Sequence, residues 1–218
     1  MIEEYQLIMK NDVWNVVPRP EGKSIVTSNW IYKINHAADG RIEKYKARFV
    51  ACGFSQKEGR DYVETFAPVA RYTSIRSIFA LAAVMKWKVH QMDAKTSFLN
   101  GVVEEEVYVE QPLSFETHDR ETHACKFNKA LEGLKQAPKT WYGRIDIFLS
   151  SLGFMKSKVD SKLYYKVEDG NLVMLLLYVD DMFVTGMDGL IADTKRKLAA
   201  KFKMKDLGMM HYFLGMEV

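Results

Sequence analysis

The chain has 218 residues, of which 48% are hydrophobic and 27% charged, and its formal net charge at pH 7 is +3. This composition is typical of one large or two small globular domains and excludes a disordered chain. No apolar run approaches the roughly 20 residues that a membrane span needs, and so small a net charge does not by itself indicate nucleic-acid binding. The acidic N-terminus predicts no secretory signal, and the widely separated Cys52 and Cys125 favour a reducing compartment.

The first half of the chain predicts a β-hairpin and then a helix. Residues 29–35 and 42–53 are rich in β-branched and aromatic residues, and the Asp-Gly pair in the intervening "HAADGR" is typical of a hairpin turn. Residues 73–87 change to helical spacing, and Thr73 or Ser74 is placed to cap that helix. The residues expected on its apolar stripe are Ile75, Ile78, Phe79, Ala82 and Met85.

The rest of the chain alternates between predicted strands and helices. In chain order we expect strands over 88–95 and 106–112, a loop over 113–124, a helix over 136–154, three strands joined by turns at 169–171 and 180–181 over 162–186, a helix over 190–204 and a final strand over 211–218. A hairpin followed by interleaved strands and helices predicts an α+β fold with a mostly antiparallel sheet.

Two adjacent carboxylates end the most apolar stretch of the chain. Asp180 and Asp181 directly follow "LLLYV", and Asp93 ends another predicted strand in "VHQMDAK". Three carboxylates at the ends of neighbouring strands would raise one another's pKa unless a cation neutralised them. Carboxylates select hard cations such as Mg²⁺, and two such ions about 4 Å apart can catalyse phosphoryl transfer.

The simpler interpretation of "DD" is that the pair only forms a hairpin turn. The glycine or asparagine that such turns prefer is absent here, which weakens that interpretation. Spacing alone leaves the metal site and the plain turn both open.

The chain resembles the reverse transcriptases of copia-type LTR retrotransposons. The resemblance is carried by "YVDD" and by six blocks in the family's order: "YKARFVACGFSQ", "DYVETFAPVARYTSIRSIFALAA", "HQMDAKTSFLNGVVEEEVYVEQP", "ALEGLKQAPKTWY", "LYVDDMFVTG" and "FKMKDLGMMHYFLGMEV". "YVDD" alone would be a weak signal, whereas six ordered blocks covering essentially the whole chain are specific.

The resemblance implies an α+β right-hand polymerase fold. We expect fingers and palm subdomains, with an antiparallel palm sheet packed on helices, with residues 1–87 mostly fingers and residues 88–218 mostly palm. The chain ends after a strand like the primer grip, so we expect no thumb, RNase H or integrase. The implied activity is RNA-directed DNA polymerisation, with an RNA or DNA template, a primer and dNTPs as partners.

The metal-binding positions of the family match Asp93, Asp180 and Asp181, together with the backbone carbonyl of Ala94. Two Mg²⁺ ions would bind there, with Mn²⁺ able to substitute. Tyr178 and Val179 would face the primer terminus. "YFLGMEV" resembles the primer-grip hairpin with Gly215 at its turn.

The resemblance also implies a nucleotide site. Phe98 matches the aromatic residue that excludes the 2′-hydroxyl of an rNTP, although it could be an ordinary core residue. Gln136 matches a glutamine that contacts the nucleotide near its 3′-OH, although an isolated glutamine beside a helix start would more commonly be a solvated cap. Lys46 and Arg48 would share one strand face and grip the triphosphate, or that face could simply be solvated. Lys33 on the facing strand would be able to join them.

Lys205 lies where such polymerases carry a lysine that protonates the leaving pyrophosphate, with Lys203 as its competitor and a surface lysine as the plain alternative for each. A basic run, Lys195, Arg196, Lys197 and Lys201, would be a solvated helix face or a sequence-independent phosphate contact.

Three departures from the family pattern stand out. Glu132 replaces a usual aromatic residue, Ser161 a usual proline, and "GMMH" at 208–211 a more charged stretch. The expected protein is therefore a reverse transcriptase fragment, in the cytoplasm within a virus-like particle or in the nucleus, and neither secreted nor bound to a membrane. The alternative is a truncated, inactive relic that binds nucleic acid at most.

Overall fold

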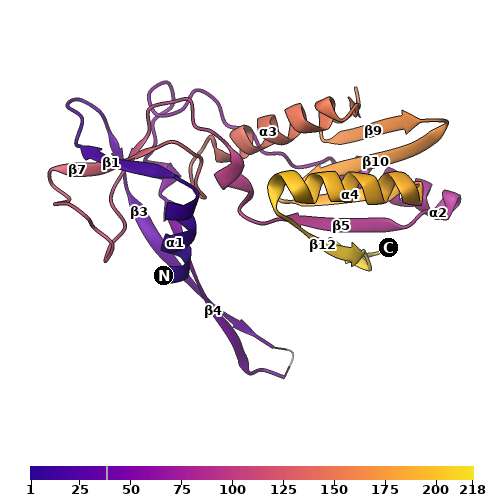
Figure 1. Cartoon of the computed structure of the whole chain (residues 1–218), viewed down its shortest axis with the longest axis horizontal. Helices are drawn as coiled ribbons and strands as arrows, with labels where there is room; N and C mark the ends of the chain where they lie inside the picture. The colour runs from indigo at the N-terminus through magenta and orange to yellow at the C-terminus, as the bar shows by residue number, and fades with distance from the viewer. Residues whose placement is uncertain (38) are drawn as a thin grey trace. The chain divides into compact units, whose positions relative to one another are not determined.

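The computed structural model describes residues 1–37 and 39–218, which fold into two compact units (Figure 1). Unit 1 comprises Met1–Phe66 and Phe98–Trp141, and unit 2 comprises Ala67–Ser97 and Tyr142–Val218. Both units combine helices with β-sheets, so the mixed α and β composition expected from the sequence is confirmed. The compact units do not follow a single boundary near residue 87, and the division into polymerase subdomains stays a prediction.

Unit 1 contains a four-stranded sheet, a long hairpin and an N-terminal helix. Its elements are α1 (Ile2–Lys10), β1 (Trp14–Pro18), β2 (Ile25–Val26), β3 (Ser28–His36), β4 (Ile42–Ala51), β6 (Tyr108–Val109) and β7 (His123–Phe127). The sheet has the order β1-β7-β6-β2, in which only the β2–β6 pair is parallel. β3 and β4 form the predicted hairpin. Ala38, which belongs to the predicted turn, lies outside the described residues.

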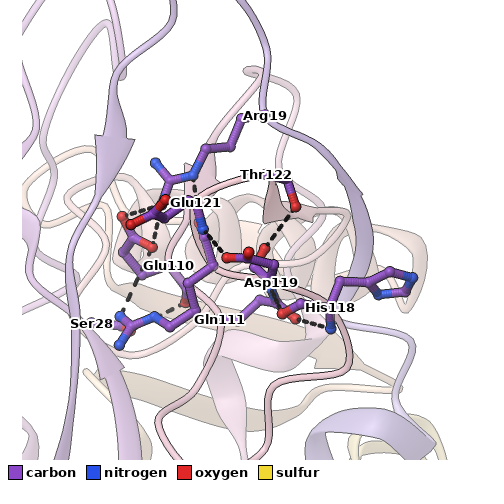
Figure 2. Close-up of polar contacts among 9 residues, drawn as sticks. Arg19, Ser28, Glu110, Gln111, His118, Asp119, Glu121 and Thr122 are labelled. Atoms are coloured by element: carbon purple, nitrogen blue, oxygen red, sulfur yellow. Dashed lines mark hydrogen bonds and ion pairs between the residues drawn. The ribbon is translucent and has the colours of Figure 1, made fainter.

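The segment 106–127 differs from its prediction. Of the strand expected over 106–112, only the two residues of β6 form a strand. The loop predicted over 113–124 ends at the start of β7, a strand that pairs with both β1 and β6. Gln111 holds the loop back onto the strands because its buried Oε1 accepts the backbone N–H of Thr117 at 3.1 Å. Its Nε2 donates to the carbonyl oxygen of His118 at 3.0 Å (Figure 2). This loop is therefore held by polar contacts and also by the ring of Phe115, which stacks on Tyr5 with centroids 4.4 Å apart.

Aromatic rings form the centre of the unit 1 core. The Trp14 ring meets the rings of Phe49 and Phe127 edge-on, with centroid separations of 5.6 and 5.5 Å. Such contacts join β1, β4 and β7 and so tie the root of the hairpin to the four-stranded sheet.

Two glycines let β4 approach the segment 131–134. A Cβ atom on Gly53 would lie 2.1 Å from the carbonyl oxygen of Gly133, and one on Gly133, whose φ is +94°, would lie 2.0 Å from that of Ala51. The backbones consequently touch, and the Ala51 N–H donates to the Glu132 carbonyl at 2.9 Å. This contact places the Glu132 side chain beside the end of β4.

Unit 2 is built on a six-stranded, fully antiparallel sheet with the order β12-β5-β11-β10-β9-β8. Its elements are α2 (Tyr72–Met85), β5 (Val89–Ala94), the part of α3 (Ala137–Ser151) from Tyr142 on, β8 (Met155–Lys156), β9 (Leu163–Glu168), β10 (Asn171–Tyr178), β11 (Asp181–Gly186), α4 (Asp188–Phe202), β12 (Met204–Met209), β13 (Tyr212–Phe213) and β14 (Met216–Glu217). The final strand predicted over 211–218 is instead the β13–β14 hairpin.

Apolar side chains bury both faces of the central strands. Leu176 and Phe183 face one cluster with Ile75 and Ile78 of α2, whereas α4 contacts β10, β11 and β12 (Figure 1). Because side chains alternate along a strand, "VMLLLYV" can be apolar throughout only when both faces are covered. Met85, expected on the buried stripe of α2, is 50% exposed, because it lies in the last turn of that helix.

The predicted N-cap of α2 is wrong. Arg71 occupies the N-cap position and makes no side-chain cap, while Asp160, which is 3% exposed, accepts the Arg71 N–H with Oδ2 at 2.9 Å. Its Oδ1 accepts the Lys162 N–H at 3.0 Å. Burial acts to raise the pKa of Asp160, but these bonds and one from the Ser74 hydroxyl lower that pKa below its ordinary value.

Among residues 1–37 and 39–218, no helix is both long and apolar enough to cross a membrane.

Replacing Asp160 by Asn should lower the free energy of unfolding at pH 7 by about 1–3 kcal/mol, because one buried oxygen acceptor becomes an N–H₂ donor facing N–H groups. An acid whose pKa is depressed in the folded state stabilises above its unfolded pKa and loses that effect as the pH falls. The difference in the free energy of unfolding between wild type and variant should therefore become smaller below pH 3.8, the ordinary pKa of Asp. Urea unfolding followed by circular dichroism measures both. The matched control is Asp169→Asn in an exposed turn, and an equal response of the two variants would contradict the assignment.

Candidate active site

The turn between β10 and β11 positions the adjacent aspartates. Tyr178 and Asp181 form the last pair of the two strands, so Val179 and Asp180 are the turn residues, not Asp180 and Asp181 as the sequence predicted. Val179 has φ +56°, which is rare for a β-branched residue. Its N–H donates to the Pro68 carbonyl at 2.9 Å, and the Asp180 carbonyl accepts the Ala94 N–H at 3.0 Å. The turn is thus held on both sides.

Asp181 lies directly opposite Asp93 on the neighbouring strand β5. Opposed residues of an antiparallel pair point to the same face, with Cβ atoms about 4.5–5.5 Å apart. Both side chains are partly buried. Like charges placed in this way repel, so the pair forms a locally unfavourable site that a cation would relieve.

Gln91 supports Asp181 and was not singled out from the sequence. Two residues before Asp93 on β5, it shares the face of the two aspartates, and its Nε2 donates to Asp181 Oδ1 at 2.9 Å. Burial and then the Asp93 charge raise the pKa of Asp181, while the Gln91 bond acts to lower it. The sequence did contain a signal for Gln91: it lies two residues before the candidate metal ligand Asp93 on a predicted strand, so both side chains point to the same face.

Asp180 lies at the same end of the sheet but has a different partner. Its Oδ1 accepts a hydrogen bond from the buried Ser97 hydroxyl at 2.5 Å. Across the described ranges 1–37 and 39–218, no three His, Cys, Asp or Glu side chains are grouped so that they could hold one metal ion. The donor chemistry of the Asp93–Asp181 pair fits a hard cation, and Asp180 would join it by turning from Ser97.

Lys205 flanks the aspartate pair on the outer strand. It lies opposite Asp93 on β12 and is exposed. Its competitor Lys203 is the C-cap of α4, with φ +49°, and precedes that strand. Ala94 is the last residue of β5 and pairs with Met204. Of the two lysines, therefore, Lys205 is the one on the strand face shared with Asp93.

The primer-related residues are also in contact. The Tyr178 ring packs edge-on against Phe213 at a centroid separation of 5.3 Å and an interplanar angle of 87°. Phe213 belongs to the β13–β14 hairpin, in whose turn Gly215 has φ +79°. Tyr178, one of the two residues expected at the primer terminus, thus adjoins the hairpin that resembles a primer grip.

The basic run on α4 is largely ion-paired within unit 2. Lys195 binds Asp206 at 2.5 Å, and Arg196 and Lys197 each lie 2.6 Å from Asp193. These ion pairs favour the interpretation of the basic run as a solvated helix face over its interpretation as a phosphate contact.

The residues expected to bind the nucleotide belong to unit 1, and each is described within that unit. Lys46 pairs with Lys33, and Arg48 with Ile31, so the expected common face exists. With Asn35, these residues line a cavity of about 190 Å³. Arg48, however, already binds Glu132, with Nη1 and Oε1 2.7 Å apart.

Phe98 and Gln136 are packed into unit 1. Phe98 is partly buried against the apolar core. Gln136 is 1% exposed, accepts a bond from Gln56 Nε2 at 3.1 Å and donates to the Asp61 carbonyl at 3.1 Å. Its amide is engaged at both ends, unlike the solvated cap that an isolated glutamine would suggest. Its contact with a nucleotide stays a prediction.

Comparison with known proteins agrees with the sequence motifs. Residues 11–218 match the family model described as reverse transcriptase (RNA-dependent DNA polymerase). The chain is 44% identical over 220 residues to the retrovirus-related Pol polyprotein from transposon TNT 1-94 of Nicotiana tabacum, an alignment that covers 100% of this chain and 17% of that protein. It is 41% identical over 209 residues to the corresponding polyprotein from transposon RE1 of Arabidopsis thaliana, covering 95% and 14%.

A more distant match is the transposon Ty1-BR Gag-Pol polyprotein of Saccharomyces cerevisiae, 26% identical over 207 residues, covering 90% of this chain and 11% of that protein. The chain therefore spans between 11% and 17% of the length of these three relatives.

Asp181→Asn should raise the free energy of unfolding by about 1 kcal/mol in metal-free buffer at pH 7, because it removes a partly buried charge that also lies opposite Asp93. An acid whose pKa is raised in the folded state stabilises most below its unfolded pKa, and that effect is lost as the pH rises through the folded pKa. The advantage of Asn should thus vanish below pH 3.8. Urea unfolding at both pH values tests this.

In the double variant Asp93→Asn/Asp181→Asn the free energy of unfolding should rise by less than the sum of the rises in the two single variants, since either substitution alone removes the repulsion. Additive effects, or a loss of stability in the single variant Asp181→Asn, would contradict the electrostatic description of the pair.

Proposed function

The chain belongs to the reverse transcriptase family, with relatives among retrotransposon Pol polyproteins, and on this basis we propose that it adds dNTPs to the 3′-OH of a primer as a template directs. The resemblance to a copia-type reverse transcriptase domain read from the six motif blocks is thereby confirmed. The observation that carries the proposed activity is the alignment of Asp93 with Asp181 across two central strands, next to the turn that carries Asp180.

We propose that Asp93, Asp180 and Asp181, with the Ala94 carbonyl, hold two Mg²⁺ ions, for which Mn²⁺ can substitute. Bound there, the metal would activate the primer hydroxyl and neutralise charge on the triphosphate. Gln91 orients Asp181 through its 2.9 Å bond. Lys205, which lies on the same strand face as Asp93, would give a proton to the departing pyrophosphate.

The remaining roles follow the resemblance. Lys46 and Arg48 would bind the triphosphate, and Gln136 the sugar end of the nucleotide. Phe98 would exclude a 2′-hydroxyl. Tyr178 and Val179, with the hairpin around Gly215, would hold the primer terminus, an assignment supported by the contact of Tyr178 with Phe213.

We assign the fingers to unit 1 and the palm to unit 2. This division refines the single boundary near residue 87, because Phe98–Trp141 returns to the unit that contains the β3–β4 hairpin. The palm then contains every proposed metal ligand, whereas the fingers contain every proposed triphosphate ligand.

Primer extension on poly(rA)/oligo(dT) with Mg²⁺ or Mn²⁺ tests the proposal. Wild type should add dTTP, and Asp93→Asn should reduce the rate at least about 100-fold because charge stabilisation in the site is lost. The matched control Asp169→Asn should extend the primer at the wild-type rate. If wild type and Asp93→Asn extend equally little, the chain is the alternative, an inactive relic that binds nucleic acid at most.

Phe98→Ala should lower the preference for dTTP over UTP in the same assay, because the aromatic ring is proposed to fill the space of the 2′-hydroxyl. We expect the ratio of kcat/KM values to fall by at least about tenfold, a change of about 1.4 kcal/mol in discrimination. Circular dichroism of Phe98→Ala checks that the variant still folds after it loses this side chain from the core of unit 1. An unchanged ratio in a folded variant removes Phe98 from this role.

A further inference from the structure

One face of the β3–β4 hairpin carries a cluster of positive charge. Lys33 and Lys46 are directly opposite each other in the register, and Arg48 lies two residues further along β4 on the same face. All three side chains are exposed. Like charges opposed across strands are destabilising, so this face is arranged to receive an anion.

Glu132, from another segment of unit 1, places a negative charge beside this basic face. Its Oε1 lies 2.7 Å from Arg48 Nη1, and the two side chains are 41% and 46% exposed. The position of Glu132 is fixed by its backbone, since its carbonyl accepts the Ala51 N–H and the next residue, Gly133, touches β4. The ion pair is thus placed by the close backbone contact and does not depend on a chance meeting of two long side chains.

A carboxylate and a phosphate compete for the same feature of arginine. The planar guanidinium presents paired N–H donors that match the oxygens of either group, whereas each N–H can serve one acceptor well. A phosphate that approached Arg48 would therefore meet an N–H already in use and a second negative charge beside it.

We propose that Glu132 occupies on Arg48 the place of a nucleotide phosphate, so that the Arg48–Glu132 pair must open before the triphosphate is bound. Glu132 then acts as a built-in competitor that weakens triphosphate affinity and is itself no catalytic residue. This inference rests on the proposed function, because Arg48 is taken as a triphosphate ligand.

Glu4 on α1 adds to the negative charge near Arg48. It accepts a hydrogen bond from the Phe49 backbone N–H, and it interacts electrostatically with Arg48, Lys46 and Glu132. Burial raises the pKa of Glu4, and the Glu132 charge acts in the same direction, whereas the two cations lower it. Glu4 and Glu132 together therefore partly neutralise the basic face in the absence of ligand.

Calorimetric titration with inorganic tripolyphosphate, without primer or template, measures this competition directly. Glu132→Gln keeps the size of the side chain and removes its charge, so it should tighten binding by about twofold to fivefold, the range expected for an exposed ion pair. The matched control is Glu64→Gln, because Glu64 forms a similar exposed pair with Lys139 at 2.9 Å in the same unit. That control should bind as wild type does.

Arg48→Gln makes the test specific to the pair. In that background, Glu132→Gln should no longer change tripolyphosphate affinity, because the group for which the two anions compete is gone. An equal gain with and without Arg48, or no gain from Glu132→Gln, overturns the proposal, as does undetectable binding by every variant.

The titration and the extension assay separate the two proposals. If primer extension fails while Glu132→Gln tightens tripolyphosphate binding only when Arg48 is present, the inference holds and the polymerase activity does not. If extension succeeds and its KM for dTTP is the same in wild type and Glu132→Gln, the inference is overturned and the activity stands.

Discussion

The pairing of β5 with β11 is the constraint on which the candidate site depends, because it places the carboxylates of Asp93 and Asp181 opposite each other. The two carboxylates are opposed because β5 and β11 pair in register, and that register is defined by apolar residues that cover both faces of the sheet. A slip of one residue would move Asp181 to the opposite face and take Phe183 away from its cluster with Ile75 and Ile78. The same packing that stabilises the sheet therefore holds together two charges that would otherwise separate, which is the arrangement expected of a site that binds a cation.

The sequence was most informative where a pattern was local. The apolar run before the aspartates predicted β10 and its neighbour β11, and the helical spacing after Arg71 predicted α2 to within about two residues. The turn was misplaced by one residue, because two-residue turns usually show glycine or asparagine, and here Val179 takes the positive φ instead. That shift has a consequence, since it places Asp181 on the strand beside Asp93 and leaves Asp180 in the turn.

Features that depend on distant residues could not be read from the sequence. The N-cap residue of α2 is Arg71, and its N–H is bonded by Asp160 from far along the chain, so the nearby Thr73 and Ser74 were a reasonable but wrong expectation. The burial of Gln136 depends on Gln56 and Asp61, and the partner of Arg48 is Glu132. Glu132 was noticed as a departure from the family pattern, but only the contact of Gly53 with Gly133 explains why its carboxylate reaches Arg48. The sequence thus identified many of the candidate residues, while the fold determined their partners.

The most direct test of the account is whether Asp93 and Asp181 together bind a divalent cation. Titration of the protein with Mn²⁺, with free Mn²⁺ measured by electron paramagnetic resonance, gives affinity and stoichiometry without primer, template or nucleotide. The account predicts that wild type and Asp169→Asn bind Mn²⁺ alike, and that Asp93→Asn and Asp181→Asn each weaken binding at least about tenfold. Equal Mn²⁺ affinity in all four proteins would contradict it.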